Sequence, residues 1–407
     1  MAAVSRRSAL STALRAASAG AAISMAAGLS SCAGGSRGRS GASSSPAARP
    51  ASPLPSLKAT GDVSVLGSRK VYTSFYPLQP AVSPPSGAPR PAGTSFAAVF
   101  TGAGSRVAHT ASAAAELSNL LPWDIGGQRL CTYFRQVDDG SPNPQSFRRG
   151  EFVLADGRLQ EIATIRRTPT QRHPGPSLLA EMHDIVLLSR SHWILQDYVK
   201  TSVRGRPVWA PYVQEVKDGR VVFEWLGTEH PEVLELAAPK AVRIEGADDA
   251  WHLNSLALHE DGGLILSLRS ANAVIKVSRT SGQVLWVLGG KGNQFAGAPS
   301  FRVQHDARVQ NGALVLFDNG AQQSRGLVVA LDEENRRCTE VRSYALPGRV
   351  SRFGGSTRVL EDGLVAVGWG LGRSHAEVFT VFAPDGTPKL SLSAQSPDLG
   401  VYRAIAA

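Results

Sequence analysis

Apolar residues alternate with other residues along much of the chain from about Lys58 onward. In the stretch WHLNSLALHEDGGLILSLRS (251–270), leucines recur at every second position on either side of EDGG, as expected for two half-buried strands joined by a turn. The stretch EFVLADGRLQEIATI (151–165) has the same strand-turn-strand pattern. The sequence therefore predicts an all-β fold, and its 41 glycines and 25 prolines agree with a chain rich in turns.

This pattern belongs to a weak internal repeat. Units of about four short strands over roughly fifty residues begin near 182, 251, 304 and 354. Two of them close similarly, with VQEVKDGRVVFEWLG and with VSRTSGQVLWVLGG. Repeats of this size and content are typical of propeller blades, so the globular length predicts a β-propeller of about six blades.

The first 57 residues differ in composition from the rest. They contain six arginines and no acidic residue, so most of the net charge of +10 lies there. SRRSAL, a stretch of small residues and LSSC resemble a twin-arginine export signal with a lipobox that ends at Cys32. We therefore expect a lipoprotein export signal at 1–32, a flexible Gly/Ser/Pro tether at 33–57 and the propeller at 58–407. A disordered N-terminus with a chance cysteine is the alternative.

The signal predicts an exported protein whose Cys32 carries a lipid anchor at the outer face of the cell membrane. The basic charge does not indicate a nucleic-acid partner, because the part after residue 57 has neither a binding motif nor a run of Lys and Arg. Two further cysteines, Cys131 and Cys338, form either a disulfide or two inert thiols. The sequence leaves the oligomeric state open.

Three histidines occupy equivalent places in successive units. His183, His252 and His305 each begin the first strand of a unit. Blades are related by rotation about one axis, and the first strand of each lines the central channel. The three imidazoles, with Asn254 and Arg269, are therefore expected to converge at one end of the channel.

Several motifs carry a resemblance to a known family. WHLNS, an arginine at the end of the paired strand, QHDAR, LFDNG, SRGLV and VGWG follow in this order between 251 and 370. Together they resemble the aryl-sulfate sulfotransferases (arylsulfotransferases), in particular their exported actinobacterial branch. The resemblance implies a β-propeller that passes a sulfuryl group from a phenolic sulfate ester to a phenol through a sulfated histidine, without a cofactor.

The resemblance also implies roles for single residues. His305 in QHDAR is the expected nucleophile, and His252 and His183 are the expected proton donors and acceptors. The expected contacts to the sulfuryl oxygens are Asn254, Arg269, Asn319 and Arg325. Asp306 either orients the loop after the nucleophile or lies in a solvated turn.

Other interpretations stay open. The cluster also suits a non-catalytic propeller that binds an anionic ligand or a surface partner, or a propeller lyase or hydrolase acting on an anionic polymer. Three histidines suit a metal ion as well, but an arginine among them disfavours a dication, so we expect no metal. Trp251, Trp286 and Trp369 are expected to pack between blades, although Trp123 or Trp369 at a channel mouth would also hold an aromatic acceptor.

Overall fold

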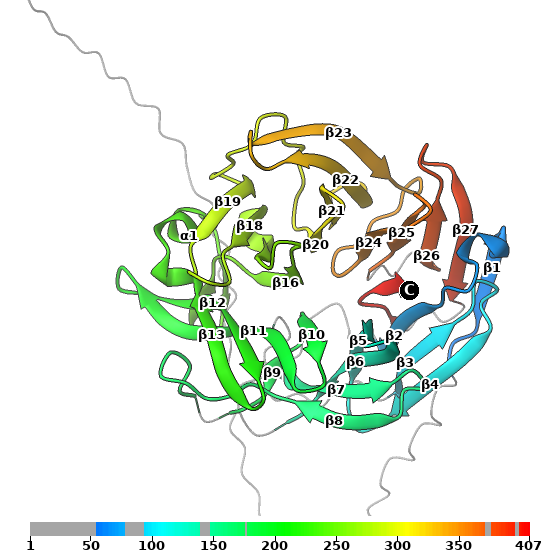
Figure 1. Ribbon diagram of the computed structural model, residues 1–407, viewed down its shortest axis with the longest axis horizontal. Coiled ribbons are helices and arrows are strands. Elements are labelled where there is room, and N and C mark those ends of the chain that lie inside the picture. The colour runs from blue at the N-terminus through cyan, green and yellow to red at the C-terminus, as the bar shows by residue number, and fades with distance from the viewer. Residues whose placement is uncertain (1–53, 78–92, 139–146, 176, 371–375, 395–398) are drawn as a thin grey trace, which may run out of the picture. The chain divides into compact units, whose positions relative to one another are not determined.

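The structure is a computed structural model, and it describes residues 54–77, 93–138, 147–175, 177–370, 376–394 and 399–407. The expected signal, Cys32 and most of the tether lie outside these residues. The described residues 54–407 belong to one compact unit, in which six β-sheets form a ring (Figure 1). The predicted β-propeller and its six blades are confirmed.

The blades follow the chain, and each uses mainly consecutive strands. Blade 1 consists of β2 (Val71–Pro77), β3 (Ser95–Phe100) and β4 (Arg106–Ser112), joined by β28 (Leu399–Gly400) and β29 (Ala404–Ala406). Blade 2 consists of β5 (Leu117–Ile125), β6 (Gln128–Gln136), β7 (Arg149–Asp156) and β8 (Glu161–Ile165), with β9 (Ala180–Glu181) beside β7. Blade 3 consists of β10 (Ile185–Ser189), β11 (His192–Val203), β12 (Arg206–Lys217) and β13 (Arg220–Leu226), extended by β14 (Val242–Ile244) and β15 (Ala247–Asp249).

The remaining three blades are regular four-stranded sheets, the last one with an added strand. Blade 4 consists of β16 (Leu253–Leu258), β17 (Leu264–Leu268), β18 (Ala273–Val277) and β19 (Val284–Gly289). Blade 5 consists of β20 (His305–Gln310), β21 (Ala313–Asp318), β22 (Arg325–Asp332) and β23 (Arg337–Tyr344). Blade 6 consists of β24 (Ser356–Val359), β25 (Val365–Gly368), β26 (Glu377–Phe382), β27 (Pro388–Ala394) and β1 (Leu57–Gly61).

Helical structure is scarce in the described residues. It includes one short helix, α1 (Pro231–Glu235), and the 3₁₀ turns η1 (Val63–Leu66), η3 (Gly227–Glu229) and η4 (Arg269–Ala271). No described helix is long and apolar enough to cross a membrane. The two described cysteines, Cys131 and Cys338, are buried free thiols, so the disulfide alternative is wrong.

The change from apolar to polar strands across a blade has a simple structural cause. Middle strands such as β17 and β18 are buried on both faces, because each blade packs against its two neighbours. The strand β23 on the outer edge has mostly exposed side chains. The sequence is therefore almost continuously apolar in the second strand of a blade and becomes polar towards the outermost strand.

Tryptophans join neighbouring blades at repeated positions. The Trp225 indole N–H donates to the carbonyl of Gly282 in the next blade, and that of Trp286 donates to Glu333 in the blade after it. Trp369 is fully buried beside Phe317 of blade 5 and Phe382 of its own blade. For Trp286 and Trp369 the prediction of inter-blade packing is confirmed, and a role for the fully buried Trp369 at a channel mouth is wrong.

Both ends of the described unit close the ring. The C-terminal strand β29 pairs with β2 and is the innermost strand of blade 1, so the C-terminus lies near the centre of the ring (Figure 1). The strand β1 pairs with β27 and is the outermost strand of blade 6. The residues just before β29 are thereby carried into the central channel.

Candidate functional site

Three histidines lie together where inner strands begin. His183 and His252 precede the inner strands β10 and β16, and His305 is the first residue of β20. The His183 and His252 rings are 5.0 Å apart between centroids, and the ring of Tyr402 lies 6.0 Å from His183 and 6.2 Å from His305. All three imidazoles are nearly inaccessible to solvent. The structure thus brings together the residues that the repeat placed at equivalent positions.

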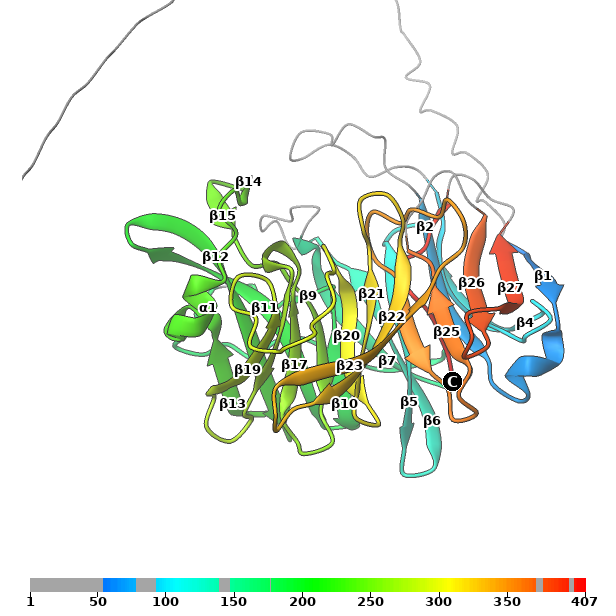
Figure 2. The same cartoon turned by 90° about the horizontal axis from the view of Figure 1, so that it is seen from above.

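The site is at the edge of the ring where the inner strands start. In side view the turn of the β5–β6 hairpin projects at one edge, and β14 and β15 project at the opposite edge (Figure 2). Because that turn follows the end of the inner strand β5, the starts of the inner strands face the edge with β14 and β15. The strand β15 leads directly into this site, since it ends at Asp249, a contact of His252.

His305 has only neutral oxygen partners at Nδ1. Its Nδ1–H donates to Asn319 Oδ1 at 2.7 Å and lies 3.1 Å from the carbonyl of Val303. Both partners are acceptors, so Nδ1 carries the proton and the lone pair of the neutral ring is on Nε2. Burial, and next the positive charge of Arg269, lower the pKa of His305 well below its ordinary value. His305 is therefore a neutral imidazole with a free Nε2 lone pair.

The other two histidines have carboxylate partners at Nδ1. His252 Nδ1 lies 2.5 Å from Asp249 Oδ2, and His183 Nδ1 pairs with a carboxylate oxygen of Glu181. A carboxylate at Nδ1 fixes the tautomer and stabilises the imidazolium form. The pKa of His252 is lowered by burial, and Asp249 opposes this effect. These two imidazoles are suited to exchange protons, whereas His305 is not.

Arg269 supplies a partly buried positive charge next to the histidines. Its backbone N–H donates to the carbonyl of His252, which fixes η4 beside the start of β16. Within the described residues no carboxylate forms an ion pair with its guanidinium, and its Nε–H is buried without a hydrogen-bond acceptor. The guanidinium lies over the ring of Phe353, with its carbon 5.6 Å from the centroid. A half-desolvated cation without an ion pair favours an anion as ligand.

Comparison with known proteins adds a family to this geometry. Residues 208–373 match the family model of arylsulfotransferase (ASST). Over this segment, which is less than half of the chain, the β-propeller is similar to the arylsulfotransferases. The matched segment contains His252, Asn254, Arg269 and His305, whereas His183 precedes it. The resemblance predicted from the motifs is confirmed over this segment.

Comparisons of the whole chain give only remote likenesses. No curated protein matches the sequence. Among solved structures, a protein of unknown function from Bacteroides caccae is 12% identical with a TM-score of 0.49, and the match covers 83% of this chain and 98% of that one. TolB from Acinetobacter baumannii is 10% identical with a TM-score of 0.44, over 83% of this chain and 67% of that one. Likenesses this remote carry no argument about activity.

Of the other residues predicted to contact the sulfuryl group, Asn254 lies on the inner strand of blade 4. It is fully buried on β16, and one amide N–H donates to the carbonyl of Gln304, the residue before His305. Its Oδ1 is buried without a partner in the described part of the chain. Asn254 therefore links blades 4 and 5 beside the nucleophile candidate.

Asn319 and Arg325 are used differently from the prediction. The Asn319 amide N–H groups donate to the carbonyls of Ser351 and Gly354, and its Oδ1 accepts from His305. Asn319 is thus placed to position His305 and has no free donor for an anion. Arg325 pairs with Asp318 on the neighbouring strand at 2.9 Å and has no contact with the three histidines in the described structure.

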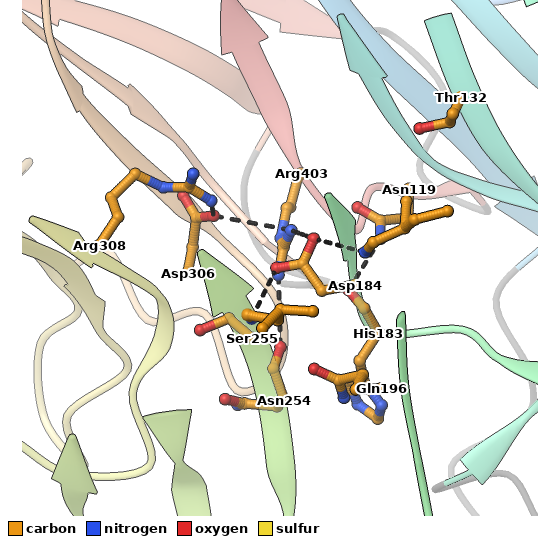
Figure 3. Close-up of polar contacts among 12 residues, drawn as sticks. Asn119, Thr132, His183, Asp184, Gln196, Asn254, Ser255, Asp306, Arg308 and Arg403 are labelled. Carbon is orange, nitrogen blue, oxygen red and sulfur yellow. Dashed lines mark hydrogen bonds and ion pairs between the residues drawn. The ribbon is translucent and has the colours of Figure 1, made fainter. Parts of the chain in front are cut away.

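Sequence reasoning missed a buried ionic network one residue beyond the histidines. Arg403, which precedes β29, is fully buried and lies 3.1 Å from Asp184 and 3.6 Å from Asp306 (Figure 3). Asp306 also pairs with Arg308 and Arg358, and these cations lower the pKa of its carboxyl group. The signal in the sequence was the repeated His-Asp pair at 183–184 and 305–306.

The backbone explains how Asp306 is directed inward. The ladder between β20 and β21 slips between His305 and Arg308, and Asp306 has a φ of 57°. Aspartate tolerates this left-handed conformation better than most residues, and a bulge re-aims the side chain next to it. Asp306 therefore faces Arg403 in the channel, and the solvated-turn alternative is wrong.

No metal-binding arrangement is found in the described residues, where no group of three His, Cys, Asp or Glu side chains has suitable geometry. Trp123 is half-buried, and its indole N–H donates to Thr132 of the adjacent strand. The aromatic side chain beside the cationic part of the site is instead Phe353, which is 52% exposed.

Proposed function

We propose that this protein transfers a sulfuryl group from a phenolic sulfate ester to a phenol, with His305 as the group that carries it between the two half-reactions. The observation that supports this most strongly is the difference between the histidines. His305 has a neutral amide at Nδ1, whereas His252 and His183 have carboxylates. A nucleophile and two proton-transfer groups require this division.

In the first half-reaction, Nε2 of His305 attacks the sulfur of the donor. The N–S bond forms as the bond from sulfur to the phenolic oxygen breaks, and the departing oxygen takes a proton from the imidazolium of His252 or His183. The Nδ1 proton of His305 remains donated to Asn319, so the sulfated ring is an imidazolium. The positive charge of Arg269 stabilises the sulfuryl oxygens throughout.

The second half-reaction reverses these bonds with a new phenol. The neutral imidazole of His252 or His183 accepts the proton of the incoming hydroxyl group, whose oxygen attacks the sulfur. The N–S bond breaks, and its electron pair returns to Nε2 of His305. Donor and acceptor thus use one site in turn, and the enzyme regains its starting protonation.

An aromatic substrate agrees with the surroundings of Arg269. Phe353 is exposed and stacks on the guanidinium, so an apolar ring lies directly beside the anion-seeking group. A phenyl sulfate combines an anion with an aromatic ring, and the two parts match these two side chains. This supports phenolic sulfates and phenols as the small-molecule substrates.

Incubation with a chromogenic aryl sulfate, with and without a phenol acceptor, tests the proposal. We expect phenol release that depends on the acceptor, parallel steady-state lines for varied donor and acceptor, and one sulfuryl group on His305 when the acceptor is left out. The adduct has to be mapped at neutral or alkaline pH, because the N–S bond is labile in acid. His305→Ala should lose both the adduct and the transfer.

Other outcomes would favour the alternatives. An adduct on His183 or His252 would show that His305 is not the nucleophile. Full activity of His305→Ala would contradict the mechanism. Release into water that does not depend on an acceptor would indicate a hydrolase. A lack of activity with every aryl sulfate would favour a propeller that only binds an anion.

We further propose that the protein is exported and held at the outer face of the cell membrane by a lipid on Cys32. This rests on the sequence SRRSAL and on LSSC, both outside the described residues. Cys32→Ser should move the mature protein from the membrane fraction to the medium, as measured by fractionation. Retention of that variant in the membrane fraction would contradict the anchor.

A further inference from the structure

The hydroxyl group of Tyr402 has no role in the proposed mechanism. The side chain is 3% exposed, and its hydroxyl is buried without a hydrogen-bond partner in the described part of the structure. Other buried tyrosines do have acceptors, since Tyr198 donates to the carbonyl of Leu253 and Tyr344 to that of Pro384. An unpaired buried hydroxyl costs about 1–3 kcal/mol, so its presence in the site requires a reason.

The position of Tyr402 points to a ligand of this site. Its ring lies 6.0 Å from the ring of His183 and 6.2 Å from that of His305, so it is close to both the nucleophile candidate and a proton-transfer histidine. Besides burial, the positive charge of Arg269 lowers the pKa of His305, so Arg269 belongs to the same site. A donor and a cation without partners in the described residues thus belong to one site around His305.

The backbone holds Tyr402 firmly. Its carbonyl accepts from the N–H of Gly355 at 2.8 Å, and Gly354 has a φ of 67° and no room for a Cβ, which would lie 2.3 Å from the same carbonyl oxygen. The next residue, Arg403, is locked by Asp184 and Asp306. The phenol ring is thus positioned on folding, and little entropy remains to be lost when a ligand binds.

Tyr402 is also in the correct protonation state to donate. Burial is the main cause that raises the pKa of its phenol above the ordinary value, so the group stays neutral at physiological pH. A neutral phenol contributes one O–H donor, which an oxygen of a sulfuryl group accepts.

We infer that Tyr402 is a further substrate-contacting residue, whose hydroxyl donates a hydrogen bond to an oxygen of the transferred sulfuryl group between Arg269 and His305. This inference rests on the proposed function. The C-terminal segment that closes the ring thereby completes the site. The unpaired hydroxyl is explained because its acceptor arrives with the substrate.

The variant Tyr402→Phe removes the hydroxyl and keeps the ring. We expect turnover to fall about 10²-fold for every aryl sulfate, as for the loss of one donor to developing charge. The dependence of turnover on the pKa of the leaving phenol should not change, because the contact is with the transferred group. The thermal midpoint should stay equal or rise, because the lost hydroxyl had no partner in the free protein.

Tyr344→Phe is the matched control. It removes a buried hydroxyl that donates to Pro384 in the packing between blades 5 and 6. We expect it to lower the thermal midpoint and to leave turnover unchanged. The two variants should therefore separate a ligand contact from a structural one.

Calorimetric titration with inorganic sulfate separates this inference from the proposed function. If the wild-type protein binds sulfate and Tyr402→Phe binds it at least about tenfold more weakly, the contact is supported even for a protein without transferase activity. Equal sulfate affinity and equal turnover in the two proteins would overturn the inference. So would a changed dependence on the leaving phenol, which would place the hydroxyl at the departing oxygen, or a sulfuryl group mapped on Tyr402 itself.

Discussion

The substitution Asn319→Asp tests why His305 is neutral. Asn319 Oδ1 accepts from His305 Nδ1 at 2.7 Å, and a carboxylate at the same place would add a full negative charge at hydrogen-bond distance. An opposite charge this close raises the pKa of a histidine by about 1–3 units. At about 1.4 kcal/mol per unit, the imidazolium form gains about 1.4–4 kcal/mol.

The direction of the pH effect follows from the protonation of the nucleophile. In the wild-type protein the pKa of His305 is lowered well below about 6.5, so the neutral ring persists as the pH falls through that value. Activity is then lost only at lower pH, as the ring becomes protonated. In Asn319→Asp this loss should move upward by about 1–3 pH units and reach the neutral range.

The assay is the pH profile of kcat/KM for an aryl sulfate with a good leaving group, because such a donor does not need protonation of its phenol. Asn319→Ala removes the acceptor without adding charge and should lack the upward shift. Asn311→Asp is the charge control, since Asn311 is exposed in the turn at the opposite end of the β20–β21 hairpin.

The reasoning is refuted if the acid limb of Asn319→Asp coincides with that of Asn319→Ala. Both variants lose the donors to Ser351 and Gly354, so a shift caused by that loss would appear in both. A shift in the Asn311→Asp protein would show that net charge, and not the contact with His305, controls the limb.

Two further predictions concern buried arginines. Arg269→Ala should lower turnover about 10²–10³-fold for all aryl sulfates alike, as measured by steady-state kinetics. The control Arg325→Ala should retain turnover. Equal losses in both variants would contradict the role of Arg269 as the contact to the sulfuryl oxygens. Arg403→Met should lower the free energy of unfolding by about 3–5 kcal/mol in urea titrations, because it leaves the buried carboxylate of Asp184 without its cation, whereas Asp306 keeps Arg308 and Arg358. Arg129→Met breaks an exposed pair with Asp124 and should lower the free energy of unfolding by about 1 kcal/mol or less. If Arg403→Met lowered it by no more than Arg129→Met, the prediction for the buried pair would be contradicted.

Much of the fold was predictable because the repeat is local. The alternation in β16 and β17 and the turn between them are set by residues close together in the sequence, and the blade count follows from the repeat length. The convergence of His183, His252 and His305 also followed, because rotational symmetry turns equal positions in a repeat into neighbours.

The ring closure was not predictable in the same way. The strands β1 and β29 are short and lie outside the repeat, and each forms pairs with a strand more than 300 residues away in the sequence. Nothing in either segment specifies its partner. The closure is therefore decided by which sheet edges remain unpaired after the other strands have formed.

The sequence by itself determined the blade pattern, the family resemblance and which residue types gather at the start of the inner strands. The tertiary structure alone decided what each of them touches. Asn319 became the acceptor for His305, and Tyr402 and Arg403 entered the channel on the closing strand. The physical reason is that periodicity determines on which face of its sheet, and at which position along the strand, a residue lies. Hydrogen-bond partners depend instead on bulges, loops and chain ends, which do not repeat.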